Sequence, residues 1–515
     1  MASTASTKKI LIFTNSDYGQ ANVILATAYE LMLSASNIEI HIASTQGLQR
    51  AVEDTTRLAA TNAVGDASPR LVFRTLEGRS QFEASAGPDV DIFEAYDRPV
   101  NFVNAAHTIL TIDGIMLPWS PEEFTSLYRQ SMSVWDDVKP DLTVVEPLFT
   151  PALTLCNHTG VNWIVLAPNT IKDFAIPLQP RLAPLWKYPI VCSGMPFPLP
   201  ASLIPMNIAL TFVAAYMLLT SQRVKKATAY LKEHVDKDIE IITASELGVL
   251  KPAPLGLRIL VAITPELDYP FDILPSHVVP CGPIVRASPD IASSDSSLAA
   301  WLSQRPTLYV NLGSHLEMNR AEALEMASAF RVLLAKVDES GQSAAAGLQI
   351  LWKIKLKGAD AAEDIQNDIY KTIHKILGLE QNEDRIRLTD WVTAEPKSVL
   401  ESGRIICSVN HGGASSFNEA LCAGVPQVLL PAWADCYDFA NRAELLEVGR
   451  WANKKAKPRW TKDELSTGLV EVVLGPSSEK IRARAKELSQ KYPEDMGRKK
   501  AAEVLLEALG TTVSI

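Results

Sequence analysis

The sequence has no paired cysteine pattern. Its 515 residues include six cysteines, and they form neither a CxxC motif nor a close pair. This spacing excludes the disulfide framework of a small secreted domain and a CxxC redox site. It predicts reduced thiols and a cytoplasmic location. The cysteines are Cys156, Cys192, Cys281, Cys407, Cys422 and Cys436.

Positive charge is also scarce. Lysine and arginine total 49 residues against 59 aspartates and glutamates, which leaves a formal net charge of −10. Without a basic stripe to neutralise phosphates, the chain is not expected to bind nucleic acid. A nucleotide-sized anion is a different case, because a helix terminus can neutralise its charge locally.

Long hydrophobic runs are nearly absent. Residues 1–9 are polar and lead directly into a predicted strand, so they do not have the form of a signal peptide. The apolar run at residues 203–220 contains Pro205 and Asn207 and is short for a span of about 20 residues. We expect a buried or pocket-lining helix there and no stable membrane span, with peripheral membrane contact as the alternative.

What the sequence does contain is an alternation of apolar strands and helices. Residues 9–14, 38–43, 141–146 and 163–167 read as buried strands, and residues 23–33 read as a helix. This order predicts a doubly wound α/β domain. Because 515 residues are too many for one ordinary core, we expect two such domains.

A segment rich in Pro, Ser and Asp marks the boundary between the two expected domains. The proline-rich region at 171–255 interrupts the first domain and is expected to shape a substrate site. The predicted division is an N-terminal domain at 1–280, a linker at 281–297, a C-terminal domain at 298–475 and a C-terminal helical segment at 476–515.

A glycine turn between a strand and a helix is the strongest functional signal. The strand at 405–409 leads into His411 and two glycines, and a helix is expected to begin near Ser415 or Ser416. This arrangement directs backbone N–H groups and the positive end of a helix dipole at one point, which suits a diphosphate. His411 and Ser416 add donors, and Glu419 is placed one turn later to accept from sugar hydroxyls.

The segment from Trp391 to Asn441 resembles the donor-binding signature of the UDP-dependent glycosyltransferases that act on small lipophilic molecules, glycosyltransferase family 1. The likeness extends over residues 281–450 and is greatest for fungal members. It implies the GT-B fold, in which two doubly wound Rossmann-like domains face each other across a cleft. It also implies a C-terminal helix that crosses back to the first domain, a monomer, a UDP-sugar as co-substrate, no bound cofactor and inverting transfer.

The resemblance assigns a role to each part of the donor site. Trp391 would stack on uracil, and the backbone of Val392 would read the edge of the base. Glu419 would bind the ribose and Asp435 the sugar hydroxyls, while the glycine turns would hold the diphosphate. The predicted donor-site residues are Gly313, Ser314, Trp391, Val392, His411, Gly413, Ser415, Ser416, Glu419, Asp435 and Cys436.

Several positions depart from the pattern of plant members. Ala394 stands where a glutamine is common, and Ala414-Ser415 replaces a Trp-Asn pair. Cys436 replaces another glutamine and loses two strong hydrogen-bonding functions. These changes leave the diphosphate site intact but weaken the inference to glucose, which stays the first choice among hexoses.

The catalytic base is an open question in the sequence. In the family a histidine in a Gly-His pair takes the acceptor proton, but the matching pair here is Gly19-Gln20, and glutamine is not a base. Glu146 matches the aspartate partner of that histidine. Glu146 could itself be the base, its pKa raised by burial, with Gln20 orienting the acceptor. Otherwise His107 or His158 serves, or an acidic phenol or enol acceptor needs only positioning.

The acceptor pocket is expected to be apolar with few polar groups. We expect a flat hydrophobic acceptor such as a phenolic polyketide, flavonoid or sterol, contacted by Gly19, Met116, Trp119 and Phe149. Asp89-Val-Asp91 matches a metal-binding pattern of another glycosyltransferase fold but precedes no suitable strand, so no metal is predicted.

Two functions of other kinds stay open at this point. Because Gln20 replaces the family histidine, the chain could be a catalytically dead relative that binds a nucleotide-sugar or a lipophile as a sensor or carrier. A nucleotide-sugar epimerase of the same architecture is disfavoured, because Trp391 and the Asp435 loop fit a transferase better.

Overall fold

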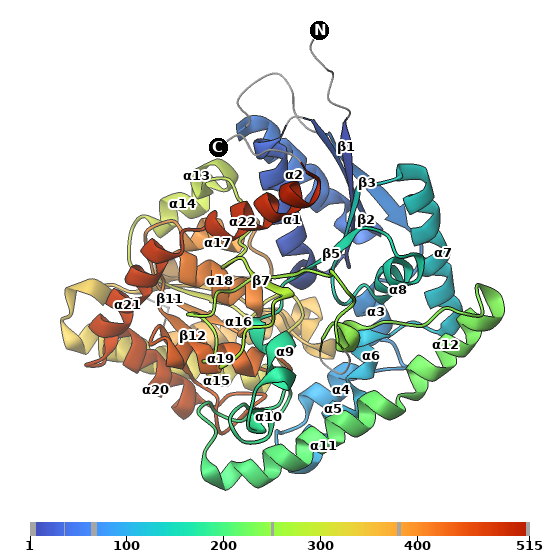
Figure 1. Cartoon of the computed structure of the whole chain (residues 1–515). Helices are drawn as coiled ribbons and strands as arrows, with labels where there is room; N and C mark the ends of the chain where they lie inside the picture. The colour runs from blue at the N-terminus through green and yellow to red at the C-terminus, as the bar shows by residue number, and fades with distance from the viewer. Residues whose placement is uncertain (1–6, 36, 63–69, 249–251, 379–382, 511–515) are drawn as a thin grey trace.

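The computed structural model describes residues 7–35, 37–62, 70–248, 252–378 and 383–510. Within them the chain forms two parallel β-sheets, each with helices on both faces (Figure 1). Residues 1–6 and 511–515 lie outside the described part, so the interpretation of the extreme N-terminus stays a prediction.

The first sheet has seven parallel strands in the order β3-β2-β1-β4-β5-β6-β7. They are β1 (Lys8–Phe13), β2 (Ile38–Thr45), β3 (Arg70–Leu76), β4 (Leu142–Val145), β5 (Trp163–Ala167), β6 (Ile259–Val261) and β7 (Val278–Pro280). Ile10 and Ile12 face one layer of helices, whereas Leu11 and Phe13 face the other. Because helices cover both faces of this sheet, its strands are continuous apolar runs in the sequence.

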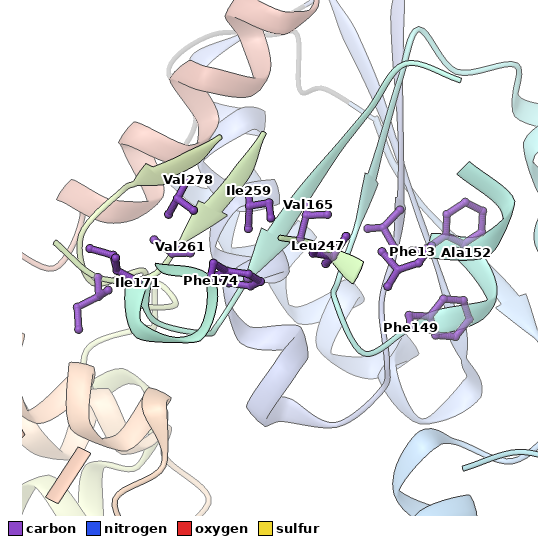
Figure 2. Close-up of a cluster of buried hydrophobic side chains, with 14 of the residues drawn as sticks. Phe13, Phe149, Ala152, Val165, Ile171, Phe174, Leu247, Ile259, Val261 and Val278 are labelled. Atoms are coloured by element: carbon purple, nitrogen blue, oxygen red, sulfur yellow. The ribbon is translucent and has the colours of Figure 1, made fainter. Parts of the chain in front are cut away.

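Helices α1 and α22 pack on the Ile10 face, and α7 and α8 on the Phe13 face. The helices of the N-terminal half are α1 (Tyr18–Ser34), α2 (Gln49–Asn62), α3 (Gln81–Ser85), α4 (Ile92–Asp97), α5 (Phe102–Thr111), α6 (Asp113–Met116), α7 (Pro121–Val138), α8 (Thr150–Thr159), α9 (Ile171–Ala175), α10 (Ala183–Trp186), α11 (Ile204–Thr220) and α12 (Gln222–His234). Figure 2 shows the core beneath the Phe13 face, where Phe13 and Phe149 stack with centroids 6.2 Å apart.

The second sheet has six parallel strands in the order β10-β9-β8-β11-β12-β13. They are β8 (Thr307–Asn311), β9 (Gln349–Lys353), β10 (Ile386–Thr389), β11 (Ile405–Asn410), β12 (Gln427–Leu429) and β13 (Gly449–Trp451). Leu308 and Val310 face α15, α16 and α20, while Tyr309 faces α14, α17 and α18. The helices are α13 (Ile291–Ser294), α14 (Ser296–Leu302), α15 (Arg320–Ser340), α16 (Glu363–Leu377), α17 (Pro396–Leu400), α18 (Ala414–Cys422), α19 (Cys436–Leu445), α20 (Lys462–Val473), α21 (Ser478–Lys491) and α22 (Met496–Ala508).

The C-terminal segment predicted at 476–515 contains two helices, α21 and α22, rather than the single crossing helix that the family resemblance implies. The chain breaks between α21 and α22 near Pro493, since proline lacks the N–H that a continuous helix needs. Helix α22 packs against α1 of the first sheet, where Arg498 Nε lies 3.2 Å from Glu30 Oε2. A Cβ at Gly497 would stand 2.1 Å from the Pro283 carbonyl oxygen, so α22 also touches the segment between the sheets.

Helix α11 is not the buried helix that was one expectation for residues 203–220, although its Tyr216, Met217 and Thr220 line a shallow hollow. Asn207, Leu210 and Met217 are covered, but Phe212, Tyr216 and Leu219 are 64–72% exposed. The reason is that α5 and α10 cover only one face of α11. By length and composition the stretch Ala201–His234 could cross a membrane, and 17% of its apolar window is buried.

Candidate active site

A pocket lies where the carboxyl ends of the two sheets approach each other, the usual ligand position in open α/β sheets. Residues Tyr18, Gly19 and Asn22 of the first domain form one wall. The opposite wall comes from the loops after β8, β10 and β11 and from the start of α18. Its predicted members are Gly313, Ser314, Trp391, Val392, His411, Gly413, Ser415, Ser416 and Glu419.

Glycines around His411 explain the shape of the donor side. A Cβ at Gly413 would stand 2.5 Å from His411 Nε2, and one at Gly313 would stand 2.7 Å from His411 Cε1. Gly412 has φ +79°, and a Cβ there would meet the Cys436 carbonyl oxygen at 2.8 Å. Both glycine turns are therefore required for the imidazole to sit between the two loops.

Helix α18 begins at Ala414 with Gly413 as its N-cap, and no side chain caps its N–H groups. Burial lowers the pKa of His411 to about 4, with the charges of His315 and Lys353 acting in the same direction. The imidazole is thus neutral near pH 7, and its Nδ1 has no hydrogen-bond partner among the residues that the structure describes. Together these groups form an unsatisfied set of donors suited to a diphosphate.

Glu419 and Trp391 line the same pocket as His411. Burial, reinforced by the charge of Glu395, raises the pKa of Glu419 to about 8. Trp391 is 60% exposed, and Lys353 Nζ lies 4.5 Å from its ring centroid. The Asn22 amide donates to Ser415 Oγ at 3.3 Å, which joins the two domains at the pocket.

Asp435 and Cys436 do not line this pocket, in contrast to the prediction. Cys436 is 1% exposed, because its backbone carbonyl packs against Gly412 and its side chain faces the core. Asp435 precedes α19 and lies among other carboxylates. Burial, with Asp173 and Asp438, raises the pKa of Asp435 to about 7.

Two of the predicted acceptor residues belong to the core instead. Trp119 and Phe149 are each 1% exposed and meet edge to face with centroids 6.2 Å apart. Trp119 Nε1 donates to the Arg79 carbonyl at 3.0 Å, which satisfies its polar atom. Met116 lies at the end of α6, where its sulfur accepts from Ser245 at 3.2 Å. Of the four predicted residues only Gly19 lines the pocket.

Glu146 is fully enclosed and does not line the pocket. Its carboxylate accepts from Asn15 Nδ2 at 2.8 Å and from the Leu148 amide at 3.0 Å. Burial raises the pKa of Glu146 to about 8. Gln20 lies in the first turn of α1 and is also absent from the pocket wall. In this arrangement Glu146 accepts hydrogen bonds from the segments that follow β1 and β4, and its role as the base stays a prediction.

Asp17 and His315 are the residues that the sequence interpretation missed. His315 follows the Gly313-Ser314 turn and lines the pocket, and its Nε2 lies 3.7 Å from Asp17 Oδ1 of the other domain. The imidazole also stacks on Phe82 with centroids 3.9 Å apart. The only sequence signals are a histidine directly after the Gly-Ser turn and an aspartate two residues before Gly19.

Burial shifts the pKa of both members of this pair. Burial lowers the pKa of His315 to about 4, helped by Lys355 and Lys353, so the imidazole is neutral near pH 7. Burial raises the pKa of Asp17 to about 6, and within the described part of the chain its Oδ2 has no hydrogen-bond partner. By contrast, the histidines expected from the sequence lie elsewhere, His107 on α5 and His158 beside Asp236 at 3.7 Å.

Comparisons with known proteins agree with this geometry. Residues 374–490 match the family model described as UDP-glucoronosyl and UDP-glucosyl transferase. The chain is 33% identical to "Glycosyltransferase sdnJ" of Sordaria araneosa over 454 residues, which cover 88% of this chain and 85% of the relative.

Solved structures give the same fold. The glycotransferase of kitacinnamycin superposes with a TM-score of 0.61 at 19% identity, over 98% of this chain and all of that one. UDP-glucose: anthocyanidin 3-O-glucosyltransferase in complex with UDP gives a TM-score of 0.60 at 16% identity, again over 98% and 100%. These likenesses confirm the predicted two-domain GT-B fold.

Proposed function

The chain belongs to the UDP-dependent glycosyltransferases of family 1, and on this premise we propose that it transfers glucose, with inversion, to a hydroxyl of a small hydrophobic acceptor. Members of this family use a UDP-sugar as co-substrate and act on small molecules. The choice of glucose and of a phenolic polyketide, flavonoid or sterol as acceptor is the proposal.

The observation that carries the proposal is the pocket between the domains. It combines the uncapped start of α18, the neutral His411 and the exposed Trp391 within one wall. In the proposed complex the diphosphate meets the two glycine turns and His411, uracil stacks on Trp391, and Glu419 binds the ribose. The Lys353 ammonium lines the same wall and would offset negative charge on the diphosphate.

The proposed proton acceptor is His315, with Asp17 as its positioning partner. The acceptor hydroxyl gives its proton to the imidazole while its oxygen bonds to the anomeric carbon. The bond from that carbon to the β-phosphate oxygen breaks, and its electron pair leaves with UDP. The Asp17 carboxylate then stabilises the imidazolium. This pair takes the place of the family's histidine and carboxylate, so a catalytically dead sensor or carrier is not favoured.

Incubation of the purified chain with UDP-sugars and a panel of phenols, flavonoids and sterols tests the proposed function. We expect new glycosides by mass spectrometry, formed fastest with UDP-glucose and with the opposite anomeric configuration to the donor. Turnover with another UDP-hexose in preference would contradict the choice of sugar. No product with any donor, despite UDP binding, would support the binding-protein alternative.

Replacement of Trp391 by alanine is expected to weaken UDP binding roughly tenfold or more, since stacking on a base contributes ~1–3 kcal/mol. The side chain is 60% exposed, so the melting temperature should barely change. Isothermal titration with UDP measures the effect. Trp186→Ala is the matched control, because Trp186 is 44% exposed on α10 and lies outside the pocket. Equal UDP affinity in the two variants would exclude the stacking role.

A further inference from the structure

Helix α11 presents an uncovered apolar stripe. Phe212, Tyr216 and Leu219 follow one another at spacings of four and three residues, which places them on one face of a helix. They are 65%, 64% and 72% exposed. No charged residue occurs between Lys187 and Arg223, although 21% of the chain is charged.

The neighbouring helix extends this surface. Helix α5 packs against α11 and contains no lysine, arginine, aspartate or glutamate. Its Phe102, Val103 and Leu110 are 45%, 70% and 44% exposed. Leu110 and Tyr216 line one shallow hollow, which shows that the two helices expose apolar side chains on the same side. Such a contiguous patch marks a contact site rather than ordinary surface.

Basic residues border the stripe at its C-terminal end. Helix α12 continues from α11 along the outer edge of the molecule (Figure 1) and carries Arg223, Lys225 and Lys226. Arg223 donates only to backbone carbonyls, of Pro118 and Asp89, and the two lysines form no ion pair with any described residue. Asp113 lines the same hollow and accepts from Ser221 at 2.7 Å. The cluster is positive on a molecule whose net charge is −10.

We propose that α11, α5 and the start of α12 form a docking surface for a membrane that contains anionic lipids. The apolar stripe would enter the boundary between headgroups and acyl chains, and the basic residues would meet the phosphates. Charge favours this occupant over a second copy of the chain, because in a symmetric contact the basic cluster would face either its own copy or the uncharged part of α11, and neither would pair with it. Leu210 and Met217 hold the helix to the domain, so it lies on the bilayer and does not cross it.

The position of the surface relates it to catalysis. Residues of α4, α5 and α11 share a cluster with Trp433 and Ala434, which lie in the loop that follows β12. His411 contacts Trp433 with ring centroids 5.7 Å apart. A docked membrane would therefore lie on helices that pack against the Trp433 loop, which contacts His411 of the pocket, so that a lipophilic acceptor could reach the pocket from the bilayer.

Flotation of the full chain with vesicles tests the proposal. We expect the protein to float with vesicles of phosphatidylcholine and phosphatidylglycerol, and at least tenfold less with phosphatidylcholine alone. The double variants Phe212→Ser/Leu219→Ser and Lys225→Glu/Lys226→Glu should each reduce flotation at least tenfold. Leu255→Ser, at a fully exposed leucine on another segment, should float like the original chain.

Three outcomes would overturn the proposal. The first is no flotation with anionic vesicles, and the second is flotation that the α11 variant does not reduce. The third is a dimer in light scattering that the α11 variant dissociates while no vesicle binding is found, which would assign the face to a second copy. Circular dichroism of each variant separates loss of the surface from loss of the fold. Flotation is measured without turnover. A negative result would therefore contradict the membrane proposal and leave the proposed reaction untouched.

Discussion

Replacement of His315 by alanine is expected to lower kcat by about 10²–10⁴-fold, the usual contribution of a general base. The KM for the UDP-sugar should change little, because in the proposed complex His411 and the two glycine turns, and not His315, hold the diphosphate. The imidazole is well placed for this role, with Phe82 at its face and Asp17 Oδ1 3.7 Å from Nε2. Steady-state kinetics with a phenolic acceptor measures the loss.

Other histidines and carboxylates provide the controls. His107→Ala and His158→Ala should leave kcat unchanged, since neither residue lines the pocket. Glu146→Gln should retain most activity, because a glutamine oxygen can still accept from Asn15. A large loss of kcat in Glu146→Gln, together with normal turnover in His315→Ala, would return the base to Glu146.

The pH dependence separates the positioning role of Asp17 from a purely structural one. The pKa of Asp17 is about 6, so its carboxylate is ionised above that pH and neutral below it. As the pH falls through about 6, the imidazole loses its anionic partner and kcat/KM should drop. A further drop should follow near pH 4, where His315 itself becomes protonated. In Asp17→Asn the decrease in kcat/KM near pH 6 should disappear. A purely structural defect would instead lower kcat/KM by the same factor at every pH.

Replacement of Asp268 by alanine is expected to destabilise the protein by about 3–5 kcal/mol, the cost of leaving a buried charge unpaired. Arg442 of α19 and Asp268 of the first domain meet at 2.7 Å with both side chains fully buried. Arg442 Nη2 also donates to Thr170 Oγ1 at 2.9 Å. A second buried pair, Lys172 with Asp438 at 2.6 Å, lies beside it. Loss of the Asp268 carboxylate would leave the buried Arg442 guanidinium without its ion-pair partner.

Urea unfolding measures this effect, and a double-mutant cycle isolates its cause. Asp268→Ala/Arg442→Met should recover part of the stability, since neither charge is then buried alone. Arg484→Ala is the control, because Arg484 is one-third exposed in an ion pair with Glu487, a kind that contributes ~0–1 kcal/mol. Equal losses for Asp268→Ala and the double variant would mean that the pair itself is not the stabilising feature.

Much of the framework was predictable because its strands are buried on both faces. Strand β5 occupies residues 163–167 as expected, and the other predicted strands agree within a few residues. Helix boundaries were less well predicted. The first helix starts at Tyr18 rather than near Val23, so Gly19 and Gln20 belong to its first turn. The residues at the start of α1 are mostly polar, so they do not show the helical spacing of apolar residues by which a helix is recognised in sequence.

The wall formed by the predicted donor-site residues could also be anticipated as a cluster, because its residues lie close in sequence or directly after strands. Nine of its predicted members line one pocket. Asp435 and Cys436 do not, since the turn before α19 directs the cysteine into the core. The acceptor side was predicted less well. In sequence, an aromatic residue of the core such as Trp119 or Phe149 looks the same as one that lines a pocket. Only the packing in the structure shows that these two residues are buried in the core.

The two-sheet framework and the glycine turns around His411 follow from the sequence, because both depend on local patterns of apolar residues, glycine and strand ends. The tertiary structure brings together Asp17 and His315, the pair that we propose as base and positioning partner. Asp17 and His315 lie in different domains and meet only when the two sheets pack together, and no local pattern records that contact. It likewise decided that α11 is uncovered, since an apolar helix reads the same in sequence whether a neighbour covers it or not.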